Sequence, residues 1–184
     1  MESVLFALWF FAPVGIANAS PVFANRVPVL HKLGMPIDGG RTFRGKRIFG
    51  DHKTVRGFAA GTLFGLLTSA LQMFLFDNFS FFETVSGSVD YSKPTVLLMG
   101  ASLGFGALFG DAIKSFFKRQ FSVPSGQSWF PFDQIDYIVG GILFSLPFVT
   151  LDIIDYIIIA IVWFLIHPVA TVVGWLLKLK DSPI

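Results

Sequence analysis

The 184-residue sequence contains no cysteine and little charge. Without cysteine the chain forms no disulfide and no thiolate metal site. Aspartate, glutamate, lysine and arginine together make up 14% of the residues, against roughly 25% in an average soluble domain. Apolar residues make up 53%. This composition predicts an all-α integral membrane protein that forms one domain.

Long apolar runs predict about five transmembrane helices, since a spanning helix needs about 20 apolar residues. The first run carries Glu2 where a signal peptide would carry positive charge, so we expect a retained helix. Pro13 and Pro21 predict that this helix is kinked or broken, and Pro168 predicts a bend in the last one. The single catalytic domain, residues 1–184, then has spans at about 4–24, 57–77, 94–110, 135–151 and 153–177, and cytoplasmic loops at 25–56 and 111–134.

Basic residues are distributed very unevenly between the two sides of these spans. All but Lys93 of the 14 lysines and arginines fall in the loops 25–56 and 111–134 or after the last span, as Lys178 and Lys180 do. Positive loops face the cytoplasm, which predicts an outside amino terminus and a cytoplasmic carboxyl terminus in the cell membrane. Because the charge is confined to membrane-flanking loops, we expect no nucleic-acid binding.

Glycines recur inside the predicted spans with small-xxx-small spacing. Gly57, Gly61 and Gly65 share one helix face, and 100–110 contains two further pairs. Such faces let helix backbones approach closely. We interpret these glycines as packing positions.

The segment GDAIKSFFKR, residues 110–119, follows the third predicted span. If the helix continues, Asp111, Lys114, Ser115 and Lys118 lie at i, i+3, i+4 and i+7 and share one face. An ordinary solvated helix end explains this pattern equally well.

The segment FPFDQIDY, residues 130–137, opens the fourth predicted span and places Asp133 and Asp136 on one face. Helix amino termini favour carboxylates, which by itself accounts for the pair. A loop of about a dozen residues joins the two helix ends, so Asp111 is expected nearby. Three neighbouring carboxylates repel unless a cation neutralises them. Mg²⁺ held by carboxylates and substrate phosphates would do so.

A basic, glycine-rich stretch lies between residues 34 and 57. Glycines allow backbone N–H groups to approach an anion, and arginine and lysine clamp phosphate oxygens. The alternative is a basic loop that touches anionic lipid headgroups. GRTFRGK, residues 40–46, resembles a P-loop, but Arg47 stands where Ser or Thr would bind Mg²⁺ and no strand precedes it, so we reject that interpretation.

The sequence resembles the CDP-archaeol synthase family at several segments in the family's order. These are ANASPV (17–22), MPIDGG (35–40), GKRIFGDHKTVRGF (45–58), GDAIKSFFKR (110–119) and FPFDQIDY (130–137). The chain end is also similar to the wider CDP-diacylglycerol synthase group. It lacks the Lys-Asp and His-Gly-Gly elements of the bacterial members and has Gln134 where arginine is usual.

This resemblance implies a five-span, Mg²⁺-dependent enzyme that transfers cytidylyl from CTP to 2,3-di-O-geranylgeranylglyceryl phosphate and releases pyrophosphate. Catalysis would come mainly from positioning and charge neutralisation. Asp111, Asp133 and Asp136 would hold the metal, and Lys118 and Arg119 would neutralise pyrophosphate. Asp51 belongs to the phosphate-binding loop or hydrogen-bonds to cytosine or ribose. The remaining predicted residues are Arg44, Lys46, Arg47, Gly50, Asp51, His52, Lys53 and Ser115 for the nucleotide, and Asn18, Asp38, Gly39 and Arg41 for the lipid substrate.

Two other functions remain open. A CTP-dependent polyprenol kinase would use the same groups but release CDP. A small anion or Mg²⁺ transporter would place its ionisable groups near mid-membrane and often show inverted repeats, which this sequence lacks. His167, within the last span, is expected to be structural.

Overall fold

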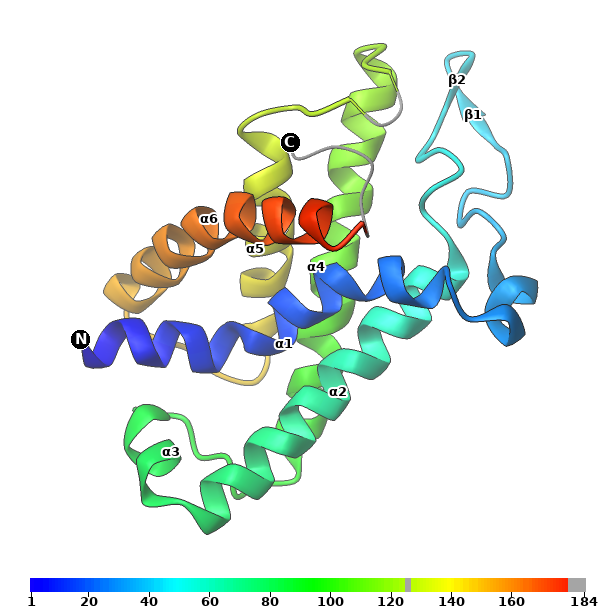
Figure 1. The fold of residues 1–184 in the computed structure, drawn as a ribbon. Helices are drawn as coiled ribbons and strands as arrows, with labels where there is room; N and C mark the ends of the chain where they lie inside the picture. The colour runs from blue at the N-terminus through cyan, green and yellow to red at the C-terminus, as the bar shows by residue number, and fades with distance from the viewer. Residues whose placement is uncertain (125–126, 179–184) are drawn as a thin grey trace.

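The computed structural model describes residues 1–124 and 127–178, so Lys180 lies outside the described residues. Helices dominate the fold (Figure 1). They are α1 (Glu2–Ala24), the 3₁₀ helix η1 (Pro28–Leu33), α2 (Val55–Asn78), α3 (Ser80–Val85), α4 (Thr95–Gln120), α5 (Phe132–Ser145) and α6 (Ile153–Leu176). The two short strands are β1 (Thr42–Phe43) and β2 (Lys46–Arg47).

Four of these helices, α1, α2, α4 and α6, are long and apolar enough to cross a membrane. This confirms the predicted helical membrane architecture. The helix expected over 135–151 is shorter, because α5 has 14 residues and ends at Ser145. It is therefore about 21 Å long, less than the ~30 Å hydrocarbon core. Pro147, two residues further on, cannot donate a helical hydrogen bond.

Two helices are continuous over more of the chain than the sequence predicted. α4 continues ten residues beyond the predicted span, to Gln120, so the loop expected at 111–134 begins only after this helix. The GDAIKSFFKR segment is therefore helical, which is the condition under which its polar residues share one face. α1 is one helix with Pro13 and Pro21 inside it, so it is not broken.

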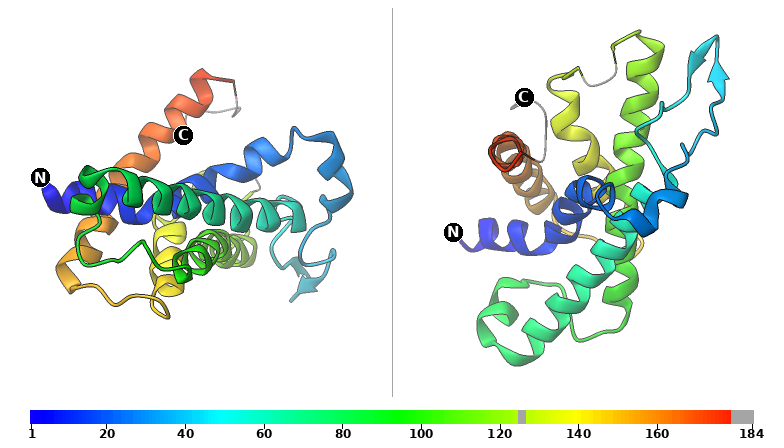
Figure 2. Two further views of the ribbon diagram at one scale, coloured as in Figure 1. Left: turned by 90° about the horizontal axis from the view of Figure 1, so that it is seen from below. Right: turned by 45° about the vertical axis from the view of Figure 1, so that its right-hand side comes forward.

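α4 lies between α2 and α5, and glycines form both contacts (Figures 1 and 2). A Cβ atom at Gly65 of α2 would lie 2.3 Å from the Gly100 carbonyl oxygen of α4. A Cβ at Gly140 of α5 would lie 2.1 Å from the Gly106 carbonyl oxygen. Only glycine fits backbones this close. The predicted packing role is confirmed for Gly61, Gly65, Gly100, Gly104, Gly106 and Gly110, whereas a Cβ at Gly57 would meet no atom closer than 3.4 Å.

α1 and α6 complete the bundle. Phe10, Phe11 and Val14 of α1 are fully buried and pack in one apolar core with Leu103 of α4 and Tyr137 of α5. The core thus fixes the α4–α5 pair against the membrane helices.

The glycine-rich segment forms a β-hairpin beside the end of α4 (Figure 2). Its turn residues, Arg44 and Gly45, have φ angles of 52° and 75°. A type I′ two-residue turn has positive φ at both positions, which glycine adopts without cost. GRTFRGK therefore lies in a hairpin and not in a strand-to-helix phosphate loop, which confirms the rejection of a P-loop.

Candidate active site

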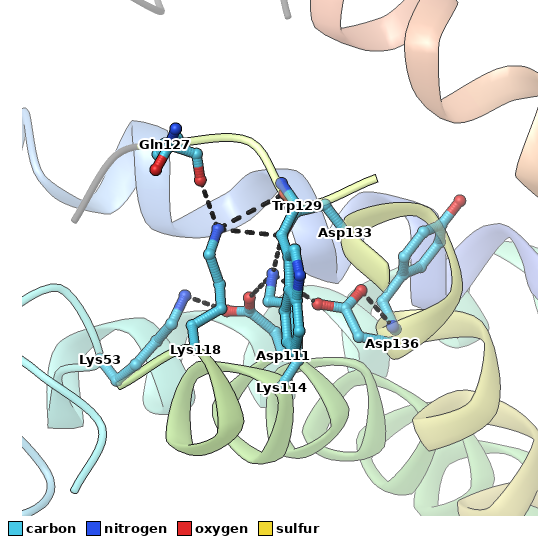
Figure 3. A network of polar contacts seen from close by, with 9 residues as sticks. Lys53, Asp111, Lys114, Lys118, Gln127, Trp129, Asp133 and Asp136 are labelled. Carbon is cyan, nitrogen blue, oxygen red and sulfur yellow. Dashed lines mark hydrogen bonds and ion pairs between the residues drawn. The ribbon is translucent and has the colours of Figure 1, made fainter. Parts of the chain in front are cut away.

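Three carboxylates from two helices surround one ammonium group (Figure 3). Nζ of Lys114 lies 3.0 Å from Oδ1 of Asp111, 2.7 Å from Oδ1 of Asp133 and 2.7 Å from Oδ2 of Asp136. The side chain of Lys114 is only 13% exposed. The sequence analysis expected the three aspartates to meet, and the structure brings them together.

The close α4–α5 contact produces this geometry. A Cβ atom at Gly110 would lie 2.1 Å from the carbonyl oxygen of Asp136, so glycine here lets α5 approach the turn that carries Asp111. Asp133 lies in the first turn of α5 and accepts a hydrogen bond from the backbone N–H of Trp129 at 2.5 Å. These contacts fix the carboxylates before any ligand binds.

Two further lysines reach the same carboxylates. Lys53, from the glycine-rich segment, donates to Asp111. Lys118, one turn after Lys114, lies 3.4 Å from Asp133 and donates to the Gln127 carbonyl oxygen. Three ammonium groups therefore balance three carboxylates, which is the neutralisation that the sequence analysis assigned to Mg²⁺.

These aspartates nevertheless fit a divalent cation chemically. Their oxygens are the hard ligands that Mg²⁺ takes, and all three converge on one point. In this structure the described residues include no group of three acidic or histidine side chains placed to bind an ion directly, and the Lys114 ammonium lies among the three aspartates. Metal binding by these aspartates stays a prediction.

A cavity of about 690 Å³ contains the cluster and is lined by both charged and apolar groups. Its charged groups come from α4, α5 and the loop before α2, whereas α1 and α6 contribute apolar groups such as Val22, Phe164 and Val172. Many predicted site residues line it: Asn18, Gly50, His52, Lys53, Asp111, Ser115, Lys118, Arg119, Asp133 and Asp136. The cavity can therefore take a ligand that is charged at one end and apolar at the other.

Four predicted nucleotide-binding residues of the hairpin region do not line this cavity: Arg44, Lys46, Arg47 and Asp51. Lys46 donates to the Gln120 carbonyl oxygen at 2.6 Å and to Ser122 Oγ at 2.8 Å, which attaches the hairpin to the end of α4. The Arg44 guanidinium lies over the Phe43 ring. Their contact with nucleotide stays a prediction, while their observed contacts hold the loop.

Asp38, predicted to bind substrate, is buried inside its own loop and lines a second hollow together with Gly39 and Arg41. Its two oxygens accept hydrogen bonds from Arg47 and from the backbone N–H groups of residues 40, 49 and 50, at 2.9–3.1 Å. Burial raises the pKa of Asp38, but these hydrogen bonds outweigh burial and lower the pKa to about 2. Asp38 thus stays ionised and organises the loop that carries Gly50 and Lys53.

The site list from the sequence omitted Lys114, Gln134 and His167, all of which line the cavity. The helical spacing already placed Lys114 on the face with Asp111, so that signal was available. Gln134 lies between the two aspartates of α5, and its Oε1 is buried without a hydrogen-bond partner among the described residues. His167 packs against the ring of Tyr137 and lines the cavity as well, which goes beyond the structural role expected for it.

Known proteins resemble this chain over its whole length. The CarS-like family, described as CDP-archaeol synthase, matches residues 1–184. A CDP-archaeol synthase of Thermococcus onnurineus is 36% identical over 100% of this chain and 98% of its own. That of Methanospirillum hungatei is 39% identical over 86% of this chain and 95% of its own.

One solved structure shares the fold. It has a TM-score of 0.72 and 26% sequence identity, and the match covers 90% of this chain and 92% of the other. It is described as an intramembrane enzyme for archaeal membrane lipids biosynthesis.

Proposed function

From the premise that the chain belongs to the CDP-archaeol synthase family, a family of CTP-dependent nucleotidyltransferases of archaeal membrane lipid biosynthesis, we propose its substrates and the roles of its residues. The acceptor is an unsaturated archaeal ether-lipid phosphate, 2,3-di-O-geranylgeranylglyceryl phosphate. The donor is CTP, and the products are the CDP-activated lipid and pyrophosphate.

The observation that carries this proposal is the two-sided cavity. Its charged part, with Lys53, Lys114 and Lys118, suits a triphosphate, and its apolar part, which α1 and α6 contribute, suits isoprenoid chains. A lipid phosphate can then meet the nucleotide where the two parts join. Holding both reactants in one site removes much of the entropic barrier to their reaction.

The reaction needs charge control more than proton transfer. An oxygen of the lipid phosphate attacks the α-phosphorus of CTP, and the bond from that phosphorus to the bridging oxygen of the β-phosphate breaks. The attacking oxygen is already anionic, so no strong base is required. The repulsion between two anions is the main barrier, and fixed cationic groups lower it.

Residues of α4 and of the glycine-rich loop are given roles toward CTP according to where they lie in the cavity. Lys118 and Arg119 neutralise the pyrophosphate as it leaves. Gly50, His52 and Lys53 of the loop and Ser115 of α4 bind nucleotide phosphates. Asp111, Asp133 and Asp136 would hold Mg²⁺, which would supply charge neutralisation on the triphosphate.

The acceptor residues are assigned around the first helix. Asn18 lines the cavity in α1 and binds the lipid headgroup. Asp38, Gly39 and Arg41 act from the neighbouring hollow, and Asp38 does so by positioning Gly50. Arg44, Lys46, Arg47 and Asp51 support the nucleotide loop. The site faces the cytoplasm, because the basic loops that form it flank the membrane on that side.

Doubly labelled CTP tests this proposal. Purified protein is incubated with Mg²⁺, CTP labelled at the α- and γ-phosphates, and both a phosphorylated digeranylgeranylglycerol and a polyprenol. We expect α-label in the phosphorylated lipid and γ-label in pyrophosphate. Transfer of γ-label to polyprenol would instead establish the kinase. CTP binding without transfer to either acceptor would contradict both enzymes and favour a transporter.

A further inference from the structure

Lys114 uses its whole hydrogen-bonding capacity on the carboxylate cluster. An ammonium group has three N–H donors, and three different carboxylates lie 2.7–3.0 Å from this one. Within residues 1–124 and 127–178 the three aspartates share no other group, since Lys53 contacts only Asp111 and Lys118 contacts only Asp133 among them. Lys114 therefore holds the cluster together.

The point that Lys114 Nζ occupies is also the point that a metal bound by these aspartates would take. Mg²⁺ sits about 2.0–2.1 Å from carboxylate oxygens, so an ion shared by them would lie within a few ångströms of the present ammonium. Two cations at that separation repel strongly in a partly buried site. The ion and the ammonium cannot be neighbours there.

We propose that Lys114 and the divalent cation are alternative occupants of one position among Asp111, Asp133 and Asp136, so that the ammonium leaves before the cation binds. This inference rests on the proposed function, which brings Mg²⁺ and CTP to this cavity. The nucleotide phosphates are the natural new partner for Lys114, because its flexible stem keeps the ammonium within the same cavity. The cation then binds more readily once phosphate is present to receive the ammonium.

Binding of Mn²⁺ alone tests the exchange, because Mn²⁺ takes similar oxygen ligands and its free form gives an electron paramagnetic resonance signal. The full chain in detergent, without nucleotide, is compared with the double variant Lys114→Met/Asp136→Asn. The double variant removes one positive and one negative charge, so the cluster stays balanced while the position is freed. We expect it to bind Mn²⁺ at least about tenfold more tightly than the unchanged protein, a typical coupling between two sites.

A matched control makes the same two kinds of substitution, lysine to methionine and aspartate to asparagine, but leaves Lys114 in place. Lys118→Met/Asp133→Asn also removes one lysine and one aspartate of the cluster. It is expected to bind Mn²⁺ no more tightly than the unchanged protein. Equal tightening in both double variants would overturn the proposal, because it would show a general effect of removing lysine.

A second measurement needs no variant and stands even if the double variants do not fold. An amine-reactive reagent modifies lysines of the unchanged protein, and mass spectrometry quantifies each site. Adding Mg²⁺ at millimolar concentration is expected to raise modification of Lys114 severalfold relative to Lys93, which lies in the loop before α4. Unchanged modification of Lys114 under conditions where Mn²⁺ binds would overturn the exchange.

The outcomes separate this inference from the function on which it rests. Tight Mn²⁺ binding to the unchanged protein without nucleotide contradicts the role of Lys114 and leaves the metal ligands standing. Failure of every protein to bind Mn²⁺, even with CTP, contradicts the metal ligands and this inference together. The labelled-CTP assay still decides cytidylyl transfer in either case.

Discussion

Two buried aspartates of this protein differ in where their partners come from. Asp38 is held by backbone N–H groups and by Arg47, all from its own loop. Asp136 accepts one backbone N–H, that of Tyr137, and pairs with Lys114 from another helix. The four donors around Asp38 fill its acceptor positions, whereas the ammonium partner of Asp136 is exchangeable. This difference separates loop-forming from ligand-binding aspartates at the residue scale.

The first prediction concerns Asp38→Asn. The amide cannot satisfy the N–H groups of residues 40, 49 and 50 and pairs poorly with Arg47, which costs on the order of 2 kcal/mol of loop stability. Trypsin, which cuts after the basic residues at 41–47, should cleave this loop roughly thirtyfold faster. Asp51→Asn is the control, because the Asp51 side chain is 75% exposed and, in the part of the chain that the structure describes, pairs only with Arg47. Equal cleavage of the two variants would contradict the role of Asp38.

The pH dependence of this loop follows from the same contacts. Because the pKa of Asp38 is lowered to about 2, below the usual value near 3.9, its stabilisation is fully present above about pH 4. It is lost only as pH falls through about 2. Amide hydrogen exchange of residues 40, 49 and 50, corrected for intrinsic rates, should therefore show constant protection between pH 8 and pH 5. Protection that declines within this range would indicate a pKa raised well above the usual value and would contradict the stabilised carboxylate.

Asp133→Asn should remove transferase activity without unfolding the protein. The change keeps the shape of the side chain but removes a charge that faces Lys114 and Lys118 and that would bind Mg²⁺. We expect turnover to fall at least about a hundredfold, as electrostatic groups of this kind often contribute. Asp90→Asn, in the loop before α4, should leave turnover unchanged. Near-normal turnover of Asp133→Asn at low Mg²⁺ would rule out this carboxylate as a metal ligand.

At the scale of elements, α4 connects packing with chemistry. Its first half contacts α2 through glycines, and its last turns carry Asp111, Lys114 and Lys118. Gly110 belongs to both parts, since it admits α5 and directly precedes Asp111. A shift of α4 along α2 or α5 would therefore move the charged cluster as well.

Of two alanine substitutions on one face of α2, only one should lower the melting temperature. At Gly65 a Cβ atom would meet the Gly100 backbone at 2.3 Å, so Gly65→Ala should cost about 1–3 kcal/mol through overpacking. The melting temperature in detergent should fall by roughly 5 °C. At Gly57 the nearest atom lies at 3.4 Å, an ordinary contact, so Gly57→Ala should melt at nearly the unchanged temperature. An equal decrease for both would contradict close packing as the reason for Gly65.

Sequence patterns predicted the long helices better than the short elements. Hydropathy located α1, α2, α4 and α6 because each has enough apolar residues to span a membrane. It overestimated α5, because the apolar run 135–151 continues past Ser145, where the helix ends. It did not reveal the hairpin, because a pair of two-residue strands has no periodicity to read. Their pairing depends on the turn at Arg44 and Gly45 and on Lys46 binding the end of α4.

At the scale of the whole molecule, helical spacing and a short connection were enough to predict that Asp111, Asp133 and Asp136 meet. They could not predict what neutralises these residues. Lys114 and Asp111 share a face in the sequence, but only the close α4–α5 contact brings Asp133 and Asp136 to the same ammonium. The roles within residues 34–57 were also undecided, because glycines and basic residues serve a folded loop and a phosphate site equally well.

The last prediction concerns the orientation of the whole chain. Nearly all basic residues flank one side, so the loop with Lys32 should face the cytoplasm and the loop with Ser88 should face outside. Because the chain has no cysteine, Lys32→Cys and Ser88→Cys each carry a single exposed thiol. A membrane-impermeant maleimide should label Ser88→Cys in intact cells and Lys32→Cys only after lysis. The reverse pattern would place the charged cavity outside the cell, away from cytoplasmic CTP, and would contradict the proposed orientation.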